Sequence, residues 1–398
     1  MPKHPESEWG VDLPKLRLDR LEKLQREMTQ RGVGALLLTN PVNIRYATGI
    51  SVMPIWTAIN FARYTLVPAR GEPAHFEYSK SLFIAREILP SAQAAKAWQY
   101  RFSQHEVDKI SKSWASDIKA RMESWGIAKE KLGFDALDFY GIRALEAAGL
   151  ILADADEAVV AAKLIKTKDE IKLLQASCRV AEAALLDLEQ AIRPGVTEQE
   201  LFGVFWHKMQ ALGGEHSSTR LLSAGQRTNP WFYEVSPNII RNGDLIGIDT
   251  DMTGPEGYLC DISRTFMCGD RADQEQREAY RVAYDFIQGV IELCRPGVEY
   301  AEIVAKSPDV AEAYHRQGYS CMIHGSGYDD EPPYLPLKFQ RGALIPRGHI
   351  QENMVLSVEF YAGKVGGYSG VKLEEQILVT ARGPELMSKY PYEARLLK

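Results

Sequence analysis

The spacing of hydrophobic positions changes near residue 156 and divides the chain into two parts. In the first part, leucines recur at helical spacing over residues 13–32, where Gly32 ends the pattern, and an apolar strand pattern follows at 34–40. Strand patterns at 61–68 and 72–79 flank a turn, which predicts a hairpin. The remaining elements predicted in this part are a polar helix near 107–124 and strands at 131–137 and 150–155, with a short helix between these two strands. The alternation predicts a small α/β domain over residues 1–156, with a mixed sheet covered by helices.

The second part, residues 157–398, begins with long amphipathic helices and continues with strands and turns. Thr167 and Glu170 form a capping box at the start of the first helix, and Thr197 and Glu200 repeat that pattern at the start of the second. From about residue 219 strand patterns alternate with turns, interrupted by one further helix pattern. The fold class predicted for the whole chain is therefore α+β.

One short sequence occurs twice in the second part. AIRPGVTEQEL at 191–201 resembles LCRPGVEYAEI at 293–303, and each copy joins two predicted helices. An Arg-Pro-Gly-Val segment is in itself a good junction between a helix end and a helix start. The matched helices on both sides favour a duplicated α+β half-unit, which would collect residues from both halves at a central pseudo-two-fold axis.

Composition excludes several classes of function. The 398 residues are 45% hydrophobic and carry a net charge of −6, which gives no reason to expect nucleic acid or an anionic membrane as a partner. We find no apolar run of the roughly 20 residues needed to span a bilayer, and MPKHPESEWG at the N-terminus lacks the apolar core of a secretory signal. The five cysteines form no CxxC pair, which favours buried thiols in a reducing cytoplasm.

The candidate chemistry lies in the C-terminal third, where acidic residues interrupt apolar segments. The candidates are Asp249, Asp251, Asp261, His324, Glu359 and Glu374. In a strand Asp249 and Asp251 share one face, and Asp261 can approach them across a hairpin. Glu359 and Glu374 lie in two strand patterns joined by a glycine-rich turn. Each residue alone has an ordinary structural explanation, but together they predict a site for two divalent metal ions, because unpaired buried carboxylates are very costly.

These segments resemble the pita-bread family of creatinase, prolidase, aminopeptidase P and methionine aminopeptidase. The matching segments are NIRYATG, IKTKDEI, GDLIGIDTDMTGPEGYLCDISRTF, HGSGYDDEPP, LSVEF and GVKLEEQILVT. The resemblance implies a creatinase-like N-terminal domain, a pseudo-two-fold catalytic domain, and metal ligands at Asp249, Asp261, His324, Glu359 and Glu374.

Three positions depart from the peptidase pattern. Trp231 and Asp330 stand where the peptidases of this family carry histidines, and Asp251 is an additional acid beside the first ligand. Losing both histidines removes groups that guide the scissile amide and stabilise an oxyanion, which disfavours peptide hydrolysis. An Xaa-Pro dipeptidase or aminopeptidase nevertheless stays open as the alternative, because Pro332 and Pro333 resemble the peptidases. A catalytically silent binding module is the third alternative.

All three departures resemble the dimethylsulfoniopropionate lyase branch of the family. That resemblance implies Asp251 as a sixth metal ligand and Asp330 as the base of a β-elimination yielding dimethyl sulfide and acrylate. Aromatic residues would hold the sulfonium, with Tyr319, Trp56 and Trp231 as candidates, although each could equally be an ordinary packing residue. The resemblance suggests iron as the metal, with manganese or zinc as alternatives, and a homodimer in which N-terminal domains help to close the partner's site.

Overall fold

A computed structural model describes residues 9–398, which form two compact units dividing between Lys163 and Leu164. Most of the segment considered as a possible secretory signal lies outside the described residues. The division falls beyond the expected boundary at residue 156 because helix α8 (Asp156–Leu164) is bonded to the first unit. The Tyr46 hydroxyl donates to the Ala162 carbonyl oxygen at 2.9 Å, and Lys163 Nζ donates to Asn43 Oδ1 at 2.7 Å.

The first unit contains a six-stranded mixed sheet in the order β4-β3-β2-β1-β5-β6. Its strands are β1 (Val33–Leu38), β2 (Tyr64–Pro68), β3 (Ala74–Glu77), β4 (Gln93–Ala94), β5 (Lys131–Phe134) and β6 (Ile151–Asp154). Strands β2 and β3 form the antiparallel hairpin that the sequence predicts, whereas β1 pairs with β5 in parallel. The mixed sheet expected for the first part is thus confirmed.

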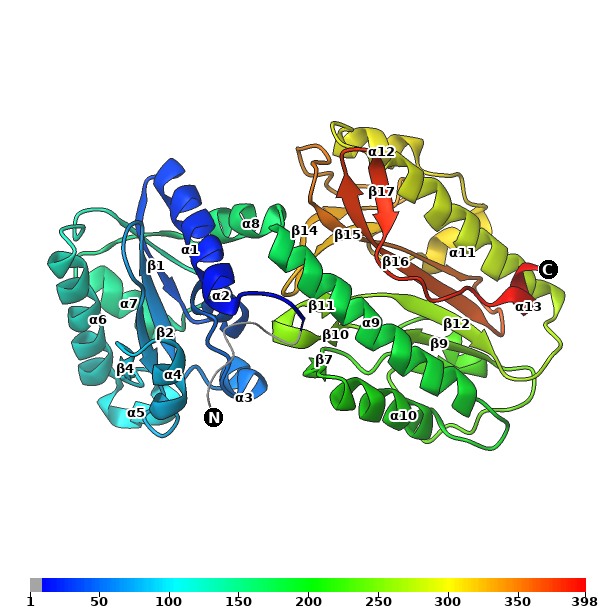
Figure 1. Ribbon diagram of the computed structural model, residues 1–398, viewed down its shortest axis with the longest axis horizontal. Coiled ribbons are helices and arrows are strands. Elements are labelled where there is room, and N and C mark those ends of the chain that lie inside the picture. Colours follow the sequence, from blue (N-terminus) through cyan, green and yellow to red (C-terminus); the bar gives the residue numbers. More distant parts are fainter. Residues whose placement is uncertain (1–8) are drawn as a thin grey trace. The chain divides into compact units, whose positions relative to one another are not determined.

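Helices cover both faces of this sheet (Figure 1). The helices are α1 (Leu13–Gln30), α2 (Pro41–Thr48), α3 (Pro54–Ile59), α4 (Leu82–Ile88), α5 (Tyr100–Ser103), α6 (Val107–Ser124) and α7 (Phe139–Ala147). Trp114 and Ile118 of α6 and Leu145 of α7 pack onto Leu37 of β1 in one buried cluster. The sequence patterns missed α2, α3 and α4, because each is too short for a 3.6-residue periodicity to stand out.

The second unit contains three sheets, in the orders β11-β10-β7, β12-β9-β8 and β14-β13-β15-β16-β17. Their strands are β7 (His216–Ser217), β8 (Leu222–Ala224), β9 (Leu245–Asp249), β10 (Met252–Thr253), β11 (Leu259–Cys260), β12 (Ser263–Met267), β13 (Ile323–Ser326), β14 (Asp330–Leu335), β15 (Val355–Gly363), β16 (Gly370–Thr380) and β17 (Gly383–Leu386). Strands β9, β12, β15 and β16 lie side by side within this unit (Figure 1). They carry three of the six candidate metal ligands, Asp249, Glu359 and Glu374.

The helices of this unit are α9 (Lys168–Ala191), α10 (Glu198–Ala211), α11 (Gln274–Leu293), α12 (Tyr300–Lys306) and the short α13 (Ala394–Leu397). Both predicted capping boxes are present, at Thr167 with Glu170 and at Thr197 with Glu200. Helix α11 packs its apolar face, including Phe286, onto β15 and β16, so that the core lies behind these two strands. Within residues 9–398, no helix is long and apolar enough to cross a membrane.

The predicted duplication is visible in the hydrogen bonds of the two repeated segments. The amide of Gly195 donates to the Ile240 carbonyl oxygen at 2.9 Å, and the amide of Gly297 donates to the Ile350 carbonyl oxygen at 2.8 Å. An isolated bridge accompanies each pair, Thr197 with Ile239 and Glu299 with His349. From each bridge the chain runs into a strand that delivers one acid, Asp249 at the end of β9 and Glu359 within β15. The two halves of the unit therefore present equivalent strands at its centre.

Candidate metal centre

The six candidate ligands line one cavity of about 340 Å³ in the second unit. The complete lining is Asp249, Asp251, Asp261, Tyr319, Ser320, Cys321, His324, Asp330, Tyr334, Glu359 and Glu374. Strand pairing explains how segments so far apart in sequence meet. Strand β9 pairs with β12, and Glu359 of β15 stands directly opposite Glu374 of β16. The two hairpins expected from the sequence are therefore present, and each carries acids toward the cavity.

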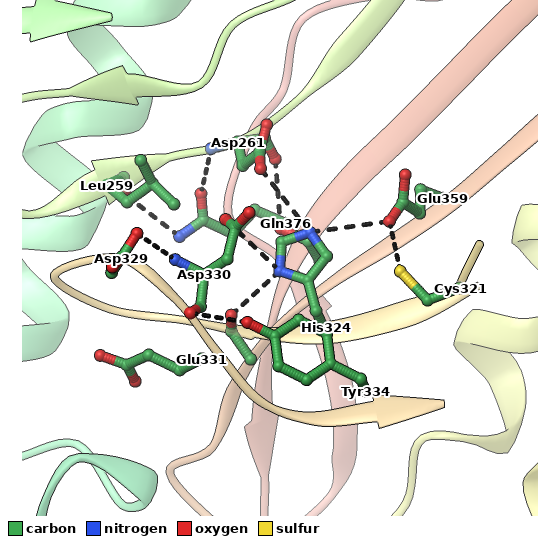
Figure 2. Close-up of polar contacts among 12 residues, drawn as sticks. Leu259, Asp261, Cys321, His324, Asp329, Asp330, Glu331, Tyr334, Glu359 and Gln376 are labelled. Atoms are coloured by element: carbon green, nitrogen blue, oxygen red, sulfur yellow. Dashed lines mark hydrogen bonds and ion pairs between the residues drawn. The ribbon is translucent and has the colours of Figure 1, made fainter. Parts of the chain in front are cut away.

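His324 lies at the centre of this cluster, on the short strand β13 (Figure 2). Its Nδ1 lies 3.0 Å from the Gly325 carbonyl oxygen, which can only accept, so Nδ1 carries a proton. Nε2 faces three carboxylates, 3.3 Å from Glu374 Oε1, 3.6 Å from Asp261 Oδ2 and 3.7 Å from Glu359 Oε1. Burial lowers the pKa of His324, but the hydrogen bond to Glu374 and the surrounding negative charges outweigh burial and raise this pKa to about 10.

Lys372 is a buried cation beside the acids that the sequence patterns did not single out. Its Nζ lies 2.8 Å from Glu359 Oε2, 3.0 Å from Glu374 Oε2 and 3.1 Å from Asp249 Oδ2. Ser263 Oγ adds contacts to Asp249 Oδ1 at 2.7 Å and to Glu374 Oε2 at 2.9 Å. Lys372 and Ser263 thus fix one side of these carboxylates. An alternation signal was available, because Lys372 stands two residues before Glu374 on the same strand face.

One carboxylate oxygen in the cluster, Asp261 Oδ1, lacks a hydrogen-bond partner within the described part of the chain, and Glu374 Oε1 has His324 Nε2 as its neighbour at 3.3 Å. Asp261 Oδ1 and Glu374 Oε1 are both buried, and most buried polar atoms in proteins are satisfied. Burial and the neighbouring acids raise the pKa of Asp261 well above its ordinary value. Buried acids with free lone pairs and one facing imidazole nitrogen are the donors expected of a site for hard or borderline divalent cations.

Asp251 lines the same cavity but stands apart from the tightest ligand groups. Three sets of donor atoms lie within 4.8 Å of one another: Asp249 with Asp261 and Glu374, His324 with Glu359 and Glu374, and Asp261 with His324 and Asp330. Asp251 has a φ of +37°, and its carboxylate accepts a hydrogen bond from the Thr219 hydroxyl. A non-glycine residue in this strained region is uncommon and typical of functional positions.

Asp330 begins β14 and extends its carboxylate to the cavity, where Oδ1 lies 3.7 Å from His324 Nδ1 (Figure 2). Burial raises the pKa of Asp330 to about 6, although the neighbouring His324 opposes the shift. The next residue, Glu331, points to the other face of the strand and forms a buried ion pair with Lys166 at 2.8 Å. Asp330 is therefore a partly exposed carboxylate with a raised pKa on a firmly held strand.

The three candidate aromatic residues occupy different places. Tyr319 lines the cavity, with Lys372 Nζ 4.7 Å from its ring centroid and Phe232 stacked on it at 5.2 Å. Trp231 is not part of the lining, because it is buried beneath the cavity against Tyr361 and Leu221. Trp56 belongs to the first unit, where it lies on α3 and is 38% exposed. The assignment of Trp56 to the substrate stays a prediction.

Comparisons with known proteins were consistent with this geometry. Residues 172–381 match the sequence profile of metallopeptidase family M24, and residues 20–167 match the creatinase/prolidase N-terminal domain. The chain belongs to metallopeptidase family M24. It therefore has the creatinase-like N-terminal domain and the pita-bread domain that the sequence predicts.

Relatives of two kinds share nearly the whole chain. The dimethylsulfoniopropionate lyase DddP of Roseovarius nubinhibens is 32% identical, over 97% of this chain and 88% of its own length. The Xaa-Pro dipeptidase of Pyrococcus furiosus is 23% identical, over 93% and 98%. Among solved structures, an Xaa-Pro dipeptidase from Bacillus anthracis superposes with a TM-score of 0.75 at 22% identity, covering 95% of this chain and 99% of that one. The structural likeness is a likeness of fold.

Enzymes of family M24 use a pair of divalent metal ions, and the residues of this cavity fit such a pair. Six carboxylates face one buried lysine and one imidazole, so the cluster has an excess of negative charge. Asp261 Oδ1, which lacks a partner among the described residues, and Glu374 Oε1, which faces His324 Nε2, can each bind a cation. Sequence reasoning missed Lys372, Ser263, Cys321 and Tyr334. Tyr334 could have been found, since Asp330 and Tyr334 fall on the same face of β14.

Proposed function

We propose that this protein is a metal-dependent lyase that cleaves dimethylsulfoniopropionate into dimethyl sulfide and acrylate by β-elimination. One observation carries the proposal: among the described residues that line the cavity, His324 is the one histidine, and Asp330 stands beside it. Peptidases resembling this chain place a histidine at the position of Asp330 and a second at that of Trp231. The 32% identical relative named as a lyase supports the same reaction.

We propose Asp249, Asp251, Asp261, His324, Glu359 and Glu374 as ligands of two divalent metal ions. When bound, these ions supply the electrophilic charge that stabilises negative charge developing on the substrate carboxylate. Oxygen and imidazole donors suit iron, which we propose as the metal, as well as manganese and zinc. Lys372 and Ser263 hold the outer oxygens of Asp249 and Glu374, so the ligands are oriented before a substrate arrives.

In this proposal Asp330 is the general base. Its carboxylate accepts the proton on the carbon next to the substrate carboxylate, and a pKa raised to about 6 by burial suits proton abstraction near neutral pH. The released electron pair forms the carbon–carbon double bond while the carbon–sulfur bond breaks. The sulfur leaves as neutral dimethyl sulfide with that bonding pair, and acrylate remains. No oxidant or reductant is needed.

The remaining assignments follow from the lyase resemblance. Tyr319 lines the cavity and can contact the sulfonium, and Trp56 is proposed to do so from the N-terminal domain of a homodimer. Trp231 packs against Tyr361 and against Gly247 of β9. We therefore propose that it is a packing residue and does not contact the substrate. All five cysteines are free, in keeping with the reducing cytoplasm proposed as the compartment.

An Xaa-Pro dipeptidase is the second candidate, favoured by the family and by the 23% identical relative. Proton NMR with both substrates in one tube separates the two functions. The lyase proposal expects vinyl signals of acrylate to appear while an Xaa-Pro dipeptide stays intact. Dipeptide hydrolysis with an unchanged sulfonium substrate would assign the protein to the peptidases.

A further inference from the structure

Tyr334 is an aromatic residue of the cavity to which the proposed reaction assigns no role. It is 47% exposed and lies on β14, four residues beyond the proposed base Asp330. Burial alternates along this strand, with Glu331, Pro333 and Leu335 buried, so Asp330 and Tyr334 share the other face. The Tyr334 hydroxyl donates to the backbone carbonyl oxygen of Asp330 at 2.8 Å. This bond holds the Tyr334 ring beside the backbone of Asp330 (Figure 2).

The ring of Tyr319 already contacts a cation of the protein, the ammonium of Lys372. Lys372 Nζ lies 4.7 Å from its centroid and is completely buried, and Phe232 stacks on the same ring at 5.2 Å. A second cation brought to that ring meets the charge of Lys372 in a poorly solvated place, where like charges repel strongly. Phe232 itself is held at a φ of +81°, in the left-handed region that aromatic residues rarely adopt. The ring of Tyr319 therefore faces a protein cation as well as the cavity.

Tyr334 has different neighbours. Within residues 9–398, no lysine or arginine lies over its ring, and its aromatic neighbour is His324, a proposed metal ligand, at 6.3 Å between centroids. Its exposed ring therefore lines the cavity without a lysine or arginine of the described residues over its π-face. A sulfonium cannot accept or donate a hydrogen bond, so an aromatic face is its natural receptor.

We propose that Tyr334 is the specificity-determining residue that receives the cationic end of the substrate. The inference rests on the proposed lyase function and adds the residue that distinguishes a charged leaving group from a neutral one. Because the Tyr334 hydroxyl is bonded to Asp330, binding at the ring places the carbon chain against the base. Tyr334 thus couples recognition of the sulfonium to the position of the proton that is removed.

The test measures charge preference rather than activity. Two inhibitors of equal shape are compared by calorimetry on metal-loaded protein: the trimethylammonium analogue of the substrate and its neutral tert-butyl isostere. Wild-type protein is expected to bind the cation more tightly. Tyr334→Leu should reduce that preference roughly three- to tenfold. Tyr334→Phe, which keeps the ring and loses the hydrogen bond, should retain it.

Tyr368→Leu is the matched control, because Tyr368 is 50% exposed on the turn between β15 and β16, outside the cavity lining. A Tyr334→Leu variant that keeps the full preference would overturn the role of Tyr334, as would equal binding of both inhibitors by wild-type protein. Release of dimethyl sulfide by the wild type is measured separately. Absence of release refutes the lyase function, whereas release with an unaltered preference in Tyr334→Leu refutes this inference alone.

Discussion

The chemistry of this site is decided by a few charged residues in one cavity. Asp249, Glu359 and Glu374 share the ammonium of Lys372, whereas Asp261 Oδ2 and Glu374 Oε1 face the imidazole of His324. Asp330 differs from all of these because it is partly exposed and begins its own strand. We therefore separate the acids into a metal-binding set and one acid free to accept a proton.

Replacing Asp330 by asparagine tests this separation. Asp330→Asn should retain both metal ions and lower kcat by roughly two to four orders of magnitude, as expected for loss of a general base. Metal content is measured by mass spectrometry and elimination by acrylate release. Asp309→Asn is the control, since Asp309 is exposed and paired with Lys338 outside the cavity. Full activity in Asp330→Asn would mean that another group is the base.

The metal-binding set predicts unequal effects for its members. Asp261→Ala should lose metal at both positions, because Asp261 belongs to two of the three close donor groups. Asp251→Ala should reduce occupancy of one position only, since its carboxylate lies outside those groups and is held by Thr219. Metal-to-protein ratios after dialysis are the measurement. Equal ratios in both variants and in wild type would exclude Asp251 and Asp261 as ligands.

At the scale of elements, a buried ion pair fixes the strand that carries the base. Lys166 Nζ lies 2.8 Å from Glu331 Oε2, and both side chains are almost fully buried. Glu331 also accepts a hydrogen bond from the Tyr328 amide at 3.2 Å. Lys166 lies just before α9, so this pair links the start of the second unit to β14. The position of Asp330 therefore depends on a residue far away in the sequence.

Replacing Lys166 by an uncharged residue should lower both the free energy of unfolding and the rate of elimination. Lys166→Met leaves Glu331 buried without its ion-pair partner, which typically costs about 3–5 kcal/mol. Denaturant unfolding should show this loss, and elimination should fall even at saturating metal. Lys338→Met breaks a pair with the fully exposed Asp309 and should cost far less stability than Lys166→Met. Similar losses in the two variants would contradict the importance of the buried pair.

The hairpin β2–β3 of the first unit contains a second buried charged group. Arg63, His75 and Glu77 are almost completely buried, and Glu77 contacts Arg63 at 3.2 Å and His75 at 3.3 Å. Burial lowers the pKa of His75. Burial raises the pKa of Glu77, but the hydrogen bond to His75 and the charge of Arg63 outweigh it, and the pKa of Glu77 lies below its ordinary value.

Both groups bind protons more readily in the unfolded chain, so acid should destabilise this hairpin. Protection from hydrogen exchange should be complete above the pKa of an unfolded histidine, about 6.5. It should fall as the pH drops below that pKa, and fall further as the pH drops below the pKa of an unfolded glutamate, about 4.5. Hydrogen exchange of peptides covering β2 and β3, corrected for intrinsic rates, should show this decrease. His75→Asn should remove the part of the decrease near neutral pH. Unchanged protection in wild type would contradict the assigned pKa directions.

Most long helices and strands, and the candidate metal ligands, could be predicted from the sequence because they follow local patterns. Long helices with capping boxes, such as α9 and α10, and strands with alternating polarity are local patterns. The six metal candidates were recognisable because acids interrupt apolar strands. Lys372 was not recognised, because its burial depends on Asp249 and Glu359, which lie on two other strands. Likewise Trp231 does not line the cavity, because it packs against Tyr361, and no local sequence pattern indicates this contact.

At the scale of the whole molecule, two units carry different tasks. The second unit contains every residue that lines the cavity, whereas Trp56 lies on α3 of the first unit. Membership of family M24 accounts for the fold and for a pair of metal ions. The reaction is a separate matter, because relatives at 32% and 23% identity are named as a lyase and a dipeptidase. In the proposed function, the side chains around the proposed metal ligands, above all Asp330, distinguish the two.

Headspace gas chromatography on purified, metal-loaded protein tests the central claim most directly. With dimethylsulfoniopropionate the account predicts dimethyl sulfide in amounts equal to the acrylate formed in solution, and loss of both products after the metal is removed by a chelator. No dimethyl sulfide above a control without enzyme, together with hydrolysis of Xaa-Pro dipeptides by the same preparation, would contradict it.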